Sequence, residues 1–170
     1  MNWYVLFVVG NEEEKIKSFL NRKYNDWEAF FPMVKKLHRM KGNDVIRLKP
    51  MFPNYIFVKS NINFIEFKSR LSEIRKQKSG IIKQLEYDHD QVSALRKEEI
   101  EYLERLLDDE FFVVPSKGYI KDGHVVITEG PLVGLESNIK KINKHNRSAL
   151  VSFNILNEIK SVSLSLIIEK

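Results

Sequence analysis

Hydrophobic residues at the start of the chain follow first a strand-like and then a helix-like spacing. The run from Trp3 to Val9 is apolar on both faces, which predicts a buried central strand. Gly10 ends this run, and Asn11 stands where a helix N-cap is expected, with three glutamates directly after it. Apolar residues at helical spacing continue to Tyr24. We therefore expect the chain to begin with a strand followed by a helix.

The same alternation continues to about residue 108. The expected elements, in order, are a strand over 27–34 that bends at Pro32, a two-stranded ribbon over 35–50 that turns at Gly42-Asn43, a strand over 55–59, a helix containing 64–74, a strand over 81–87 and a helix over 96–107. Helices and strands in this mixed order, joined by short connections, indicate an α+β fold. We expect an α/β sandwich in which helices flank an antiparallel sheet.

The pattern changes after the helix that ends near residue 107. The segment 110–123 contains one proline and two glycines and has no helical period. Beyond it, short runs rich in β-forming residues stand at 124–128, 137–142, 149–153 and 160–168. Short strands at this spacing are typical of a small SH3-like β-barrel. The sequence thus predicts an N-terminal domain over 1–110, a linker over 111–117 and a barrel over 118–170.

Composition narrows the class of protein without naming its function. The chain has a net charge of +5, which mildly favours anionic partners. It contains no cysteine, and its four histidines stand far apart, so we expect no metal and no cofactor. No apolar run approaches the roughly 20 residues that cross a bilayer, and the N-terminus does not resemble a signal peptide. We expect a cytoplasmic monomer with no membrane partner.

Three segments together resemble the NusG family of transcription factors. They are the opening strand NWYVLF, the segment PMFPNYIFV from Pro50 to Val58, and the segment VVITEGPLVGLESNIKKI, which is similar to the KOW motif of that family. Their order and separation span nearly the whole chain. The resemblance implies a NusG N-terminal-like domain, a C-terminal KOW domain and no catalytic activity.

Two glycines mark the turn of the KOW-like segment. Gly130 and Gly134 bracket a tight loop between two strands, where backbone angles that other residues avoid are expected, and Pro131 fixes one dihedral of the loop. Such a loop is also consistent with an ordinary barrel turn. The family pattern has a further glycine where this chain has Ser137.

Aromatic residues stand close together in the PMFPNYIFV segment. Alternation along a strand would place Tyr55 and Phe57 on one face, and burial in the core is the commoner fate of such residues. In the family that the chain resembles, this region binds the clamp helices of the largest subunit of RNA polymerase. The resemblance carries that role to Phe7, Phe52, Tyr55 and Phe57, with Pro53 shaping the loop.

Two basic stretches are free of acidic residues, and each lies at a predicted turn. Either could be an ordinary solvated surface, but at a turn the side chains can also reach a phosphate backbone. No aromatic residue adjoins the second stretch, which favours backbone or duplex contact over base stacking. The candidate nucleic-acid-binding residues are Lys35, Lys36, Arg39 and Lys41, with His38 among them, and Lys140, Lys141, Lys144, His145 and Arg147.

The resemblance implies a transcription elongation and antitermination factor. The N-terminal domain would bind RNA polymerase near upstream DNA, and the KOW domain would contact RNA, Rho or a ribosomal protein. The family that the chain resembles includes specialised paralogs of the LoaP group, which depend on an RNA hairpin, and the basic loop 140–147 is compatible with such a role.

Two other classes of function are open alternatives. A ribosome-associated RNA-binding protein would explain a KOW barrel and a basic chain, but not the segment around Tyr55. An enzyme would need a site at His89, between Asp88 and Asp90, or at the acidic residues 108–110. Neither position has a nucleophile, a phosphate loop or a second histidine at ligand spacing, so we expect no catalysis.

Overall fold

The computed structural model describes residues 1–87 and 94–169. Contacts within the chain divide it into two compact units. The first contains residues 1–31 and 52–100, and the second contains residues 32–51 and 101–170. The second unit thus includes residues 32–51, which lie in the sequence between the two segments of the first unit. The predicted division near residues 110–118 follows chain order and stays a prediction.

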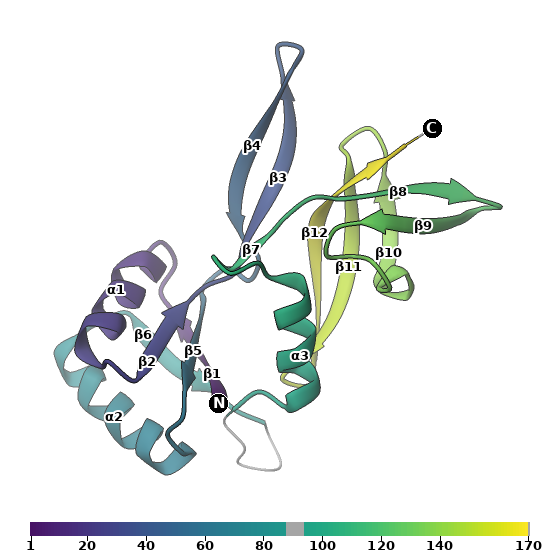
Figure 1. The fold of residues 1–170 in the computed structure, drawn as a ribbon. Coiled ribbons are helices and arrows are strands. Elements are labelled where there is room, and N and C mark those ends of the chain that lie inside the picture. Colours follow the sequence, from purple (N-terminus) through teal and green to yellow (C-terminus); the bar gives the residue numbers. More distant parts are fainter. Residues whose placement is uncertain (88–93, 170) are drawn as a thin grey trace. The chain divides into compact units, whose positions relative to one another are not determined.

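A four-stranded sheet forms the centre of the first unit (Figure 1). Its strands lie in the order β2-β5-β1-β6, with β1 paired antiparallel to β5 on one side and to β6 on the other. The prediction of a buried central strand at the N-terminus is confirmed. The strands are β1 (Asn2–Val8), β2 (Trp27–Phe30), β5 (Tyr55–Ser60) and β6 (Ile81–Leu85).

Two helices, α1 (Glu13–Lys23) and α2 (Phe64–Gln77), supply the apolar residues that pack on one face of this sheet. The core beneath them takes alternate residues from the strands, among them Tyr4, Leu6 and Val8. The helices contribute Ile16, Leu20, Phe67, Leu71 and Ile74. Both helices bury one apolar stripe, as the helical spacing predicted.

Phe67 is the central aromatic residue of this core. Its ring stacks on Tyr4 with the centroids 3.8 Å apart, and on Trp27 with the centroids 4.7 Å apart. The phenylalanine is fully buried. It therefore joins α2 to β1 and β2 at one point.

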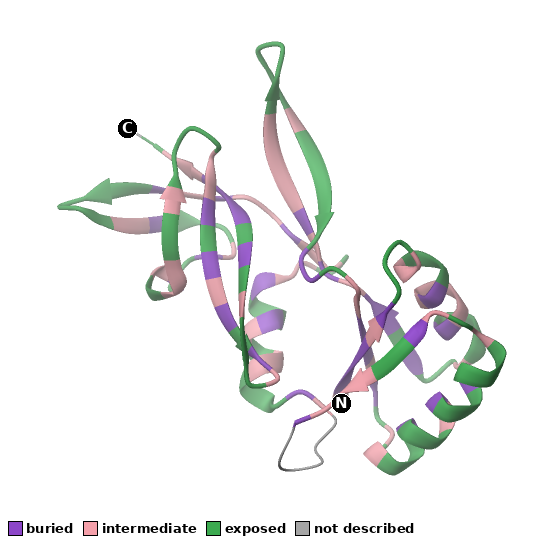
Figure 2. Cartoon of the chain, turned by 180° about the vertical axis from the view of Figure 1, so that it is seen from behind, coloured by how far each residue is buried: buried purple, intermediate pink, exposed green. Residues whose placement is uncertain are grey.

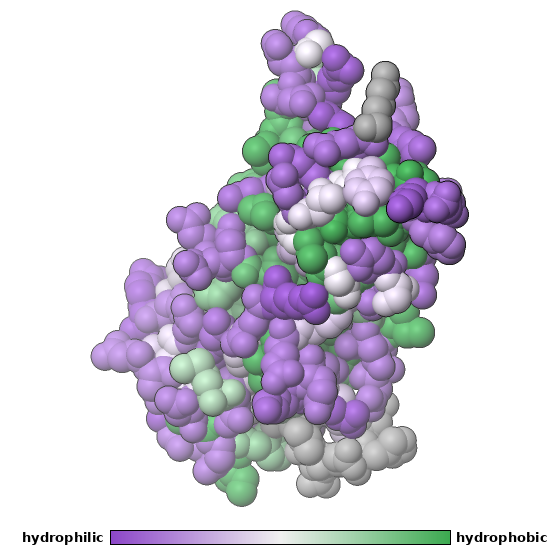
Figure 3. Space-filling view, turned by 45° about the vertical axis from the view of Figure 1, so that its right-hand side comes forward, coloured by the Kyte–Doolittle hydropathy of each residue, from purple (hydrophilic) through white to green (hydrophobic). Residues whose placement is uncertain are grey.

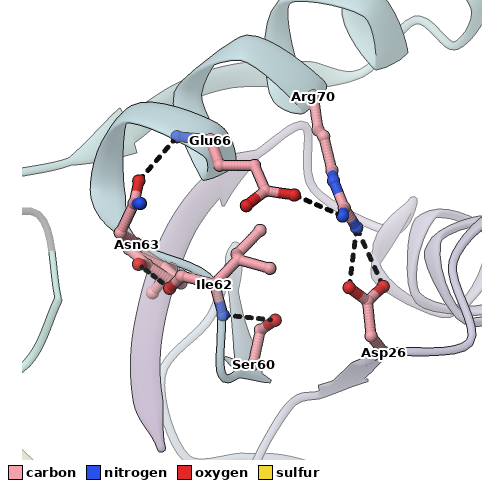
Figure 4. A network of polar contacts seen from close by, with 7 residues as sticks. Asp26, Ser60, Ile62, Asn63, Glu66 and Arg70 are labelled. Carbon is pink, nitrogen blue, oxygen red and sulfur yellow. Dashed lines mark hydrogen bonds and ion pairs between the residues drawn. The ribbon is translucent and has the colours of Figure 1, made fainter.

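Polar contacts fix the first turn of α2 (Figure 4). The side chain of Asn63 accepts a hydrogen bond from the Glu66 backbone N–H at 3.0 Å, which caps the helix. One turn later, the Arg70 guanidinium pairs with Glu66 at 2.5 Å and with Asp26 at 2.8 Å. These contacts attach α2 to the loop that enters β2.

Two local predictions for the first thirty-four residues were wrong. Asn11 is not the N-cap of α1: it has a left-handed backbone with φ of 65°, and Glu12 occupies the cap position without a capping side chain. The turn at Gly10-Asn11 delays the helix by one residue. The strand expected over 27–34 is two strands, because Pro32 ends the pairing and β3 begins after it.

The second unit contains a long β-hairpin that is exposed toward its turn (Figures 1 and 2). It consists of β3 (Met33–Met40) and β4 (Asn43–Pro50), and β3 also pairs in parallel with the short β7 (Phe112–Val113). Met40 pairs with Asn43, so the turn residues are Lys41 and Gly42, both with positive φ. The ribbon was predicted, but its turn lies one residue before the expected position.

The rest of the second unit is a five-stranded β-barrel, as the sequence predicts. The strands lie in the order β10-β11-β12-β8-β9 and bury alternate residues, so that β11 and β12 carry much of the core (Figure 2). The elements are β8 (Ser116–Lys121), β9 (His124–Glu129), the 3-10 turn η1 (Glu136–Asn138), β10 (Ile139–Asn143), β11 (Ser148–Ile155) and β12 (Glu158–Ile168). The expected linker residues 111–117 include β7 and the start of β8.

The loop between β9 and η1 requires its glycines. Gly130 and Gly134 have φ of 94° and 73°, in the left-handed region expected from the sequence. A Cβ on Gly130 would lie 2.7 Å from the Ser116 Cα, and the Ser116 hydroxyl accepts a hydrogen bond from the Leu132 N–H. Close packing against β8 therefore excludes a side chain at Gly130, next to Pro131.

Helix α3 (Lys97–Leu106) spans the boundary between the units, and its last turns pack in the second unit. Leu103 and Leu106 are buried there, and the Tyr102 ring lies edge-on to Phe153 with the centroids 5.2 Å apart. The Arg105 guanidinium donates to the Val133 carbonyl at 2.6 Å. These contacts attach the end of α3 to β11 and to the glycine loop.

We expect replacement of Phe67 by alanine to lower the free energy of unfolding by about 3–5 kcal/mol, the usual cost of truncating a buried aromatic residue. The substitution removes both ring stacks and leaves a cavity beneath α2. Urea titration followed by circular dichroism would measure the change. Ile65→Ala on the same helix is the control: Ile65 is 78% exposed, so its truncation should shift the midpoint little. Equal effects of the two substitutions would contradict this packing.

Candidate nucleic-acid interface

The two basic stretches singled out in the sequence meet in one open cleft of the second unit. The cleft has a volume of about 1030 Å³ and lies between the β3–β4 hairpin and the turn that joins β10 to β11. We call it the basic cleft. Its lining residues are Lys36, Leu37, His38, Arg39, Gly42, Asn43, Asp44, Lys49, Lys144, His145, Asn146, Arg147, Ser148 and Ser163.

The structure brings together part of the predicted set and leaves the rest outside. Lys36, Arg39, Lys144, His145 and Arg147 line the basic cleft. The candidates that do not line it are Lys35, Lys41, Lys140 and Lys141. Lys35 is engaged elsewhere, since its ammonium lies 3.7 Å from the Asp108 carboxylate and 4.5 Å from the centroid of the Phe112 ring.

Strand register places three hairpin residues that line the cleft, Lys36, His38 and Lys49, on one face of the hairpin. Lys36 pairs with Arg47 and His38 with Val45, while Lys49 pairs with Val34. Residues that pair directly share a face, and alternate residues along each strand do as well. Lys36, His38, Arg47 and Lys49 therefore lie on one face of the hairpin. Sequence reasoning missed Lys49, although alternation along the predicted ribbon could have identified it.

Hydrogen bonds from β3 to β12 close one end of the cleft. The Lys36 ammonium donates to the Ser163 hydroxyl at 2.5 Å and to the Ser163 carbonyl at 3.0 Å. The Leu37 N–H donates to the buried Ser165 hydroxyl at 3.0 Å. Burial, and then the nearby charge of Lys49, lower the pKa of Lys36. These serines had no signal in the sequence, because their contact with residue 36 spans 127 positions.

An ion pair joins the two sides of the cleft. The Arg147 guanidinium donates to the Asp44 carboxylate at 2.7 Å, which joins the β10–β11 turn to the start of β4. This hydrogen bond lowers the pKa of Asp44 and raises that of Arg147. Arg147 itself has φ of 47°, so the turn presents its side chain from a left-handed position.

His38 lies among several cations. Its Nε2 atom is buried and has no hydrogen-bond partner among the described residues. Desolvation first, and then the positive charges of Arg47, Lys49, Lys36 and Arg147, lower the pKa of His38. The neutral imidazole is therefore favoured in the free protein.

The cleft is suited to a phosphate backbone. Among the described residues that line it, five are lysine or arginine and Asp44 carries the only negative charge. The described lining contains no Phe, Tyr or Trp on which a base could stack, which favours contact with phosphates over contact with bases. Hydrophilic residues dominate the surface of the hairpin above it, at the top of Figure 3.

The aromatic residues predicted to bind polymerase lie together on the first unit. Phe7 pairs with Tyr55 across β1 and β5, and their rings are 5.9 Å apart edge-on. The Phe52 ring lies 6.2 Å from Tyr55 and 5.9 Å from Phe57. We call these four residues the aromatic face. Phe57 is fully buried and Phe52 is 5% exposed, whereas Phe7 and Tyr55 are partly exposed and Pro53 is exposed.

The sequence offered two positions for a catalytic site, His89 and the acidic residues 108–110. His89 lies outside the described residues. Asp108 accepts backbone hydrogen bonds from Glu110 at 3.0 Å and from Phe112 at 2.8 Å, so it stabilises the turn before β7. Within residues 1–87 and 94–169, no cluster of three or more His, Asp or Glu side chains is arranged to hold a metal ion. No helix in the same residues is long and apolar enough to cross a membrane.

Comparisons with known proteins find similarity to NusG proteins. Residues 1–104 match the family model described as "Transcription termination factor nusG". The solved structure titled "Domain interaction in Thermotoga maritima NusG" matches with a TM-score of 0.50 and 18% sequence identity, over 96% of this chain and 93% of that one. At this identity the likeness concerns the fold. A search of curated protein sequences found no significant match.

We expect nucleic-acid binding in the basic cleft to strengthen as pH falls from 8 to 6. Desolvation and then the surrounding cations hold the pKa of His38 below its ordinary value, and bound phosphates would offset the repulsion from the cations and raise that pKa. Binding would then take up a proton, so lower pH favours the complex. Fluorescence anisotropy with a labelled RNA hairpin would measure this.

The substitution His38→Gln should remove most of this pH dependence. His145 also lines the cleft, so His145→Gln is the matched control. If the pH dependence survives in His38→Gln and disappears in His145→Gln, the proton taken up on binding belongs to His145 in the β10–β11 turn. That result would contradict the prediction.

Proposed function

The chain belongs to the NusG family of transcription elongation and termination factors, and from this premise we propose that it binds both RNA polymerase and a nucleic acid. The aromatic face would contact the clamp helices of the largest polymerase subunit. The basic cleft would contact the phosphate backbone of an RNA hairpin or of upstream DNA. By holding the polymerase, the protein would favour continued elongation and act in antitermination. The observation that carries the nucleic-acid half is the convergence of two distant basic stretches in one cleft.

The aromatic face supports the polymerase half of the proposal. An amphipathic helix binds a groove through a few apolar anchors, and aromatic residues supply much of the affinity of such contacts. Phe7 and Tyr55 retain exposed surface and can act as anchors, whereas Phe57 and Phe52 support them from beneath. The exposed Pro53 would restrict the loop before β5.

The basic cleft favours a specialised, LoaP-like paralog. Binding the polymerase would hold the cleft near the nascent transcript and raise its effective concentration toward an RNA hairpin. The KOW barrel could also recruit Rho or a ribosomal protein. The rival, a ribosome-associated RNA-binding protein, has less support, because the family match covers residues 1–104 and therefore the part that a ribosomal barrel would lack. Co-sedimentation with polymerase, and not with ribosomes, would separate the two.

We expect the full chain to bind a peptide hairpin made from bacterial clamp helices, and Tyr55→Ala to weaken that binding. Loss of an anchor should cost about 2 kcal/mol or more, roughly thirtyfold in Kd. Isothermal titration calorimetry would measure the affinity, and circular dichroism would establish that the variant is folded.

Phe57→Ala separates packing from recognition. The side chain is fully buried, so its truncation should lower the unfolding midpoint more than Tyr55→Ala does. A control on the edge strand of the sheet, Ile82→Ala on the exposed part of β6, should change neither property. If the folded wild-type chain fails to bind the clamp-helix peptide, the polymerase half of the proposal is wrong.

A further inference from the structure

We propose that Asp44 acts as an internal competitor of nucleic acid for Arg147, so that the basic cleft binds a phosphate backbone by displacing this carboxylate. The inference rests on the proposed nucleic-acid function and adds a regulatory element to it. Asp44 would occupy the site of one phosphate in the free protein and leave it in the complex.

The geometry of the ion pair suits this role. A single Arg147 nitrogen contacts a single Asp44 oxygen at 2.7 Å, the contact that a phosphate oxygen would make with the same guanidinium. The Asp44 side chain is 56% exposed and that of Arg147 is 22% exposed, so solvent and ligands reach the pair. Exposed ion pairs are weak, and an incoming anion can replace one partner.

The position of Asp44 in the cleft explains how the ion pair would affect the binding of nucleic acid. Asp44 is the only acidic residue among the described lining residues, and it faces five lysines and arginines. Its charge weakens the positive field that would attract a polyanion. Rotation of the carboxylate away from Arg147 would release one cation and move the negative charge away from that guanidinium.

A purely structural role for the pair has less support. Lys36 and Leu37 already attach β3 to β12 through Ser163 and Ser165. Those bonds do not involve Asp44, so the hairpin can stay in place when the ion pair opens. The second unit therefore has one set of contacts that holds the cleft and a separate contact that obstructs it.

Competition of this kind selects a polyanion over a single anion. An isolated phosphate would gain only Arg147 and would have to overcome Asp44. A duplex backbone presents several phosphates at once and would also gain Arg39, Lys49 and Lys144, so the displacement becomes favourable. Because the described lining lacks Phe, Tyr and Trp, the duplex form is favoured over an unpaired strand.

The test measures binding of the full chain to a labelled RNA hairpin and to a DNA hairpin of the same sequence, by fluorescence anisotropy over a series of salt concentrations. Asp44→Asn keeps the shape of the side chain and removes its charge. The matched control is Asp122→Asn, because Asp122 is an exposed aspartate in the turn between β8 and β9, outside the cleft. Both variants change the net charge equally, and thermal melts followed by circular dichroism would compare their folding.

Asp44→Asn should bind about fivefold more tightly than Asp122→Asn, the lower end of typical coupling between sites. Its plot of log affinity against log salt should be steeper by about one, because one more cation is available to a phosphate. In an Arg147→Gln background, Asp44→Asn should lose most of its effect, since the carboxylate would act through Arg147. The nucleic-acid hairpin whose affinity increases more in the Asp44→Asn variant identifies the preferred backbone as RNA or DNA.

Three outcomes would overturn the inference. If Asp44→Asn matches Asp122→Asn in affinity and slope while the wild type binds, the competition is absent but the nucleic-acid function stands. If Asp44→Asn binds more weakly, the ion pair holds the cleft in shape. If no form of the chain binds either hairpin at low salt, the proposed nucleic-acid function and the inference built on it both fail.

Discussion

The register between β3 and β4 is the constraint on which the candidate interface depends. Successive side chains of a strand point to opposite faces, so a slip of one residue would move every side chain to the other face. The two-residue turn at Lys41 and Gly42 sets this register, and both residues adopt the positive φ that such a turn needs. Lys36, His38 and Lys49, which all line the cleft, share a face of the hairpin because the turn has this length.

The alternation of side chains along a strand also determines the two faces of the sheet in the first unit. Alternate residues of β1 and β5 pack under α1 and α2, and Phe7, Tyr55 and Phe57 of the aromatic face lie on the opposite side of the sheet. One strand therefore serves the core with Ile56 and Val58 and serves the other face with Tyr55 and Phe57. A side chain such as Phe57 cannot be assigned to packing or to recognition by its type, because the same alternation supplies both.

Elements with a strong hydrophobic period could be predicted from the sequence. The central strand β1, the helices α2 and α3, the ribbon and the barrel strands all follow local patterns. Details that depend on one backbone angle were missed, such as the left-handed Asn11 and the position of the ribbon turn. The basic residues were found as two separate stretches, but local patterns could not show that residues 36–49 and 144–147 line one cleft. That convergence depends on contacts of β3 with β12, more than a hundred residues away.

A cleft built this way is unfavourable for the free protein. Lys36 and His38 both have lowered pKa values, because burial and neighbouring cations oppose their charge. The Nε2 atom of His38 gains no hydrogen bond among the described residues to offset its burial. Among the described lining residues, Asp44 alone carries a negative charge that offsets the repulsion, and it does so through a contact open to solvent. Like charges gathered at such a cost are readily explained by a ligand of opposite charge, and a phosphate backbone would relieve at once the repulsion that a single aspartate relieves in part.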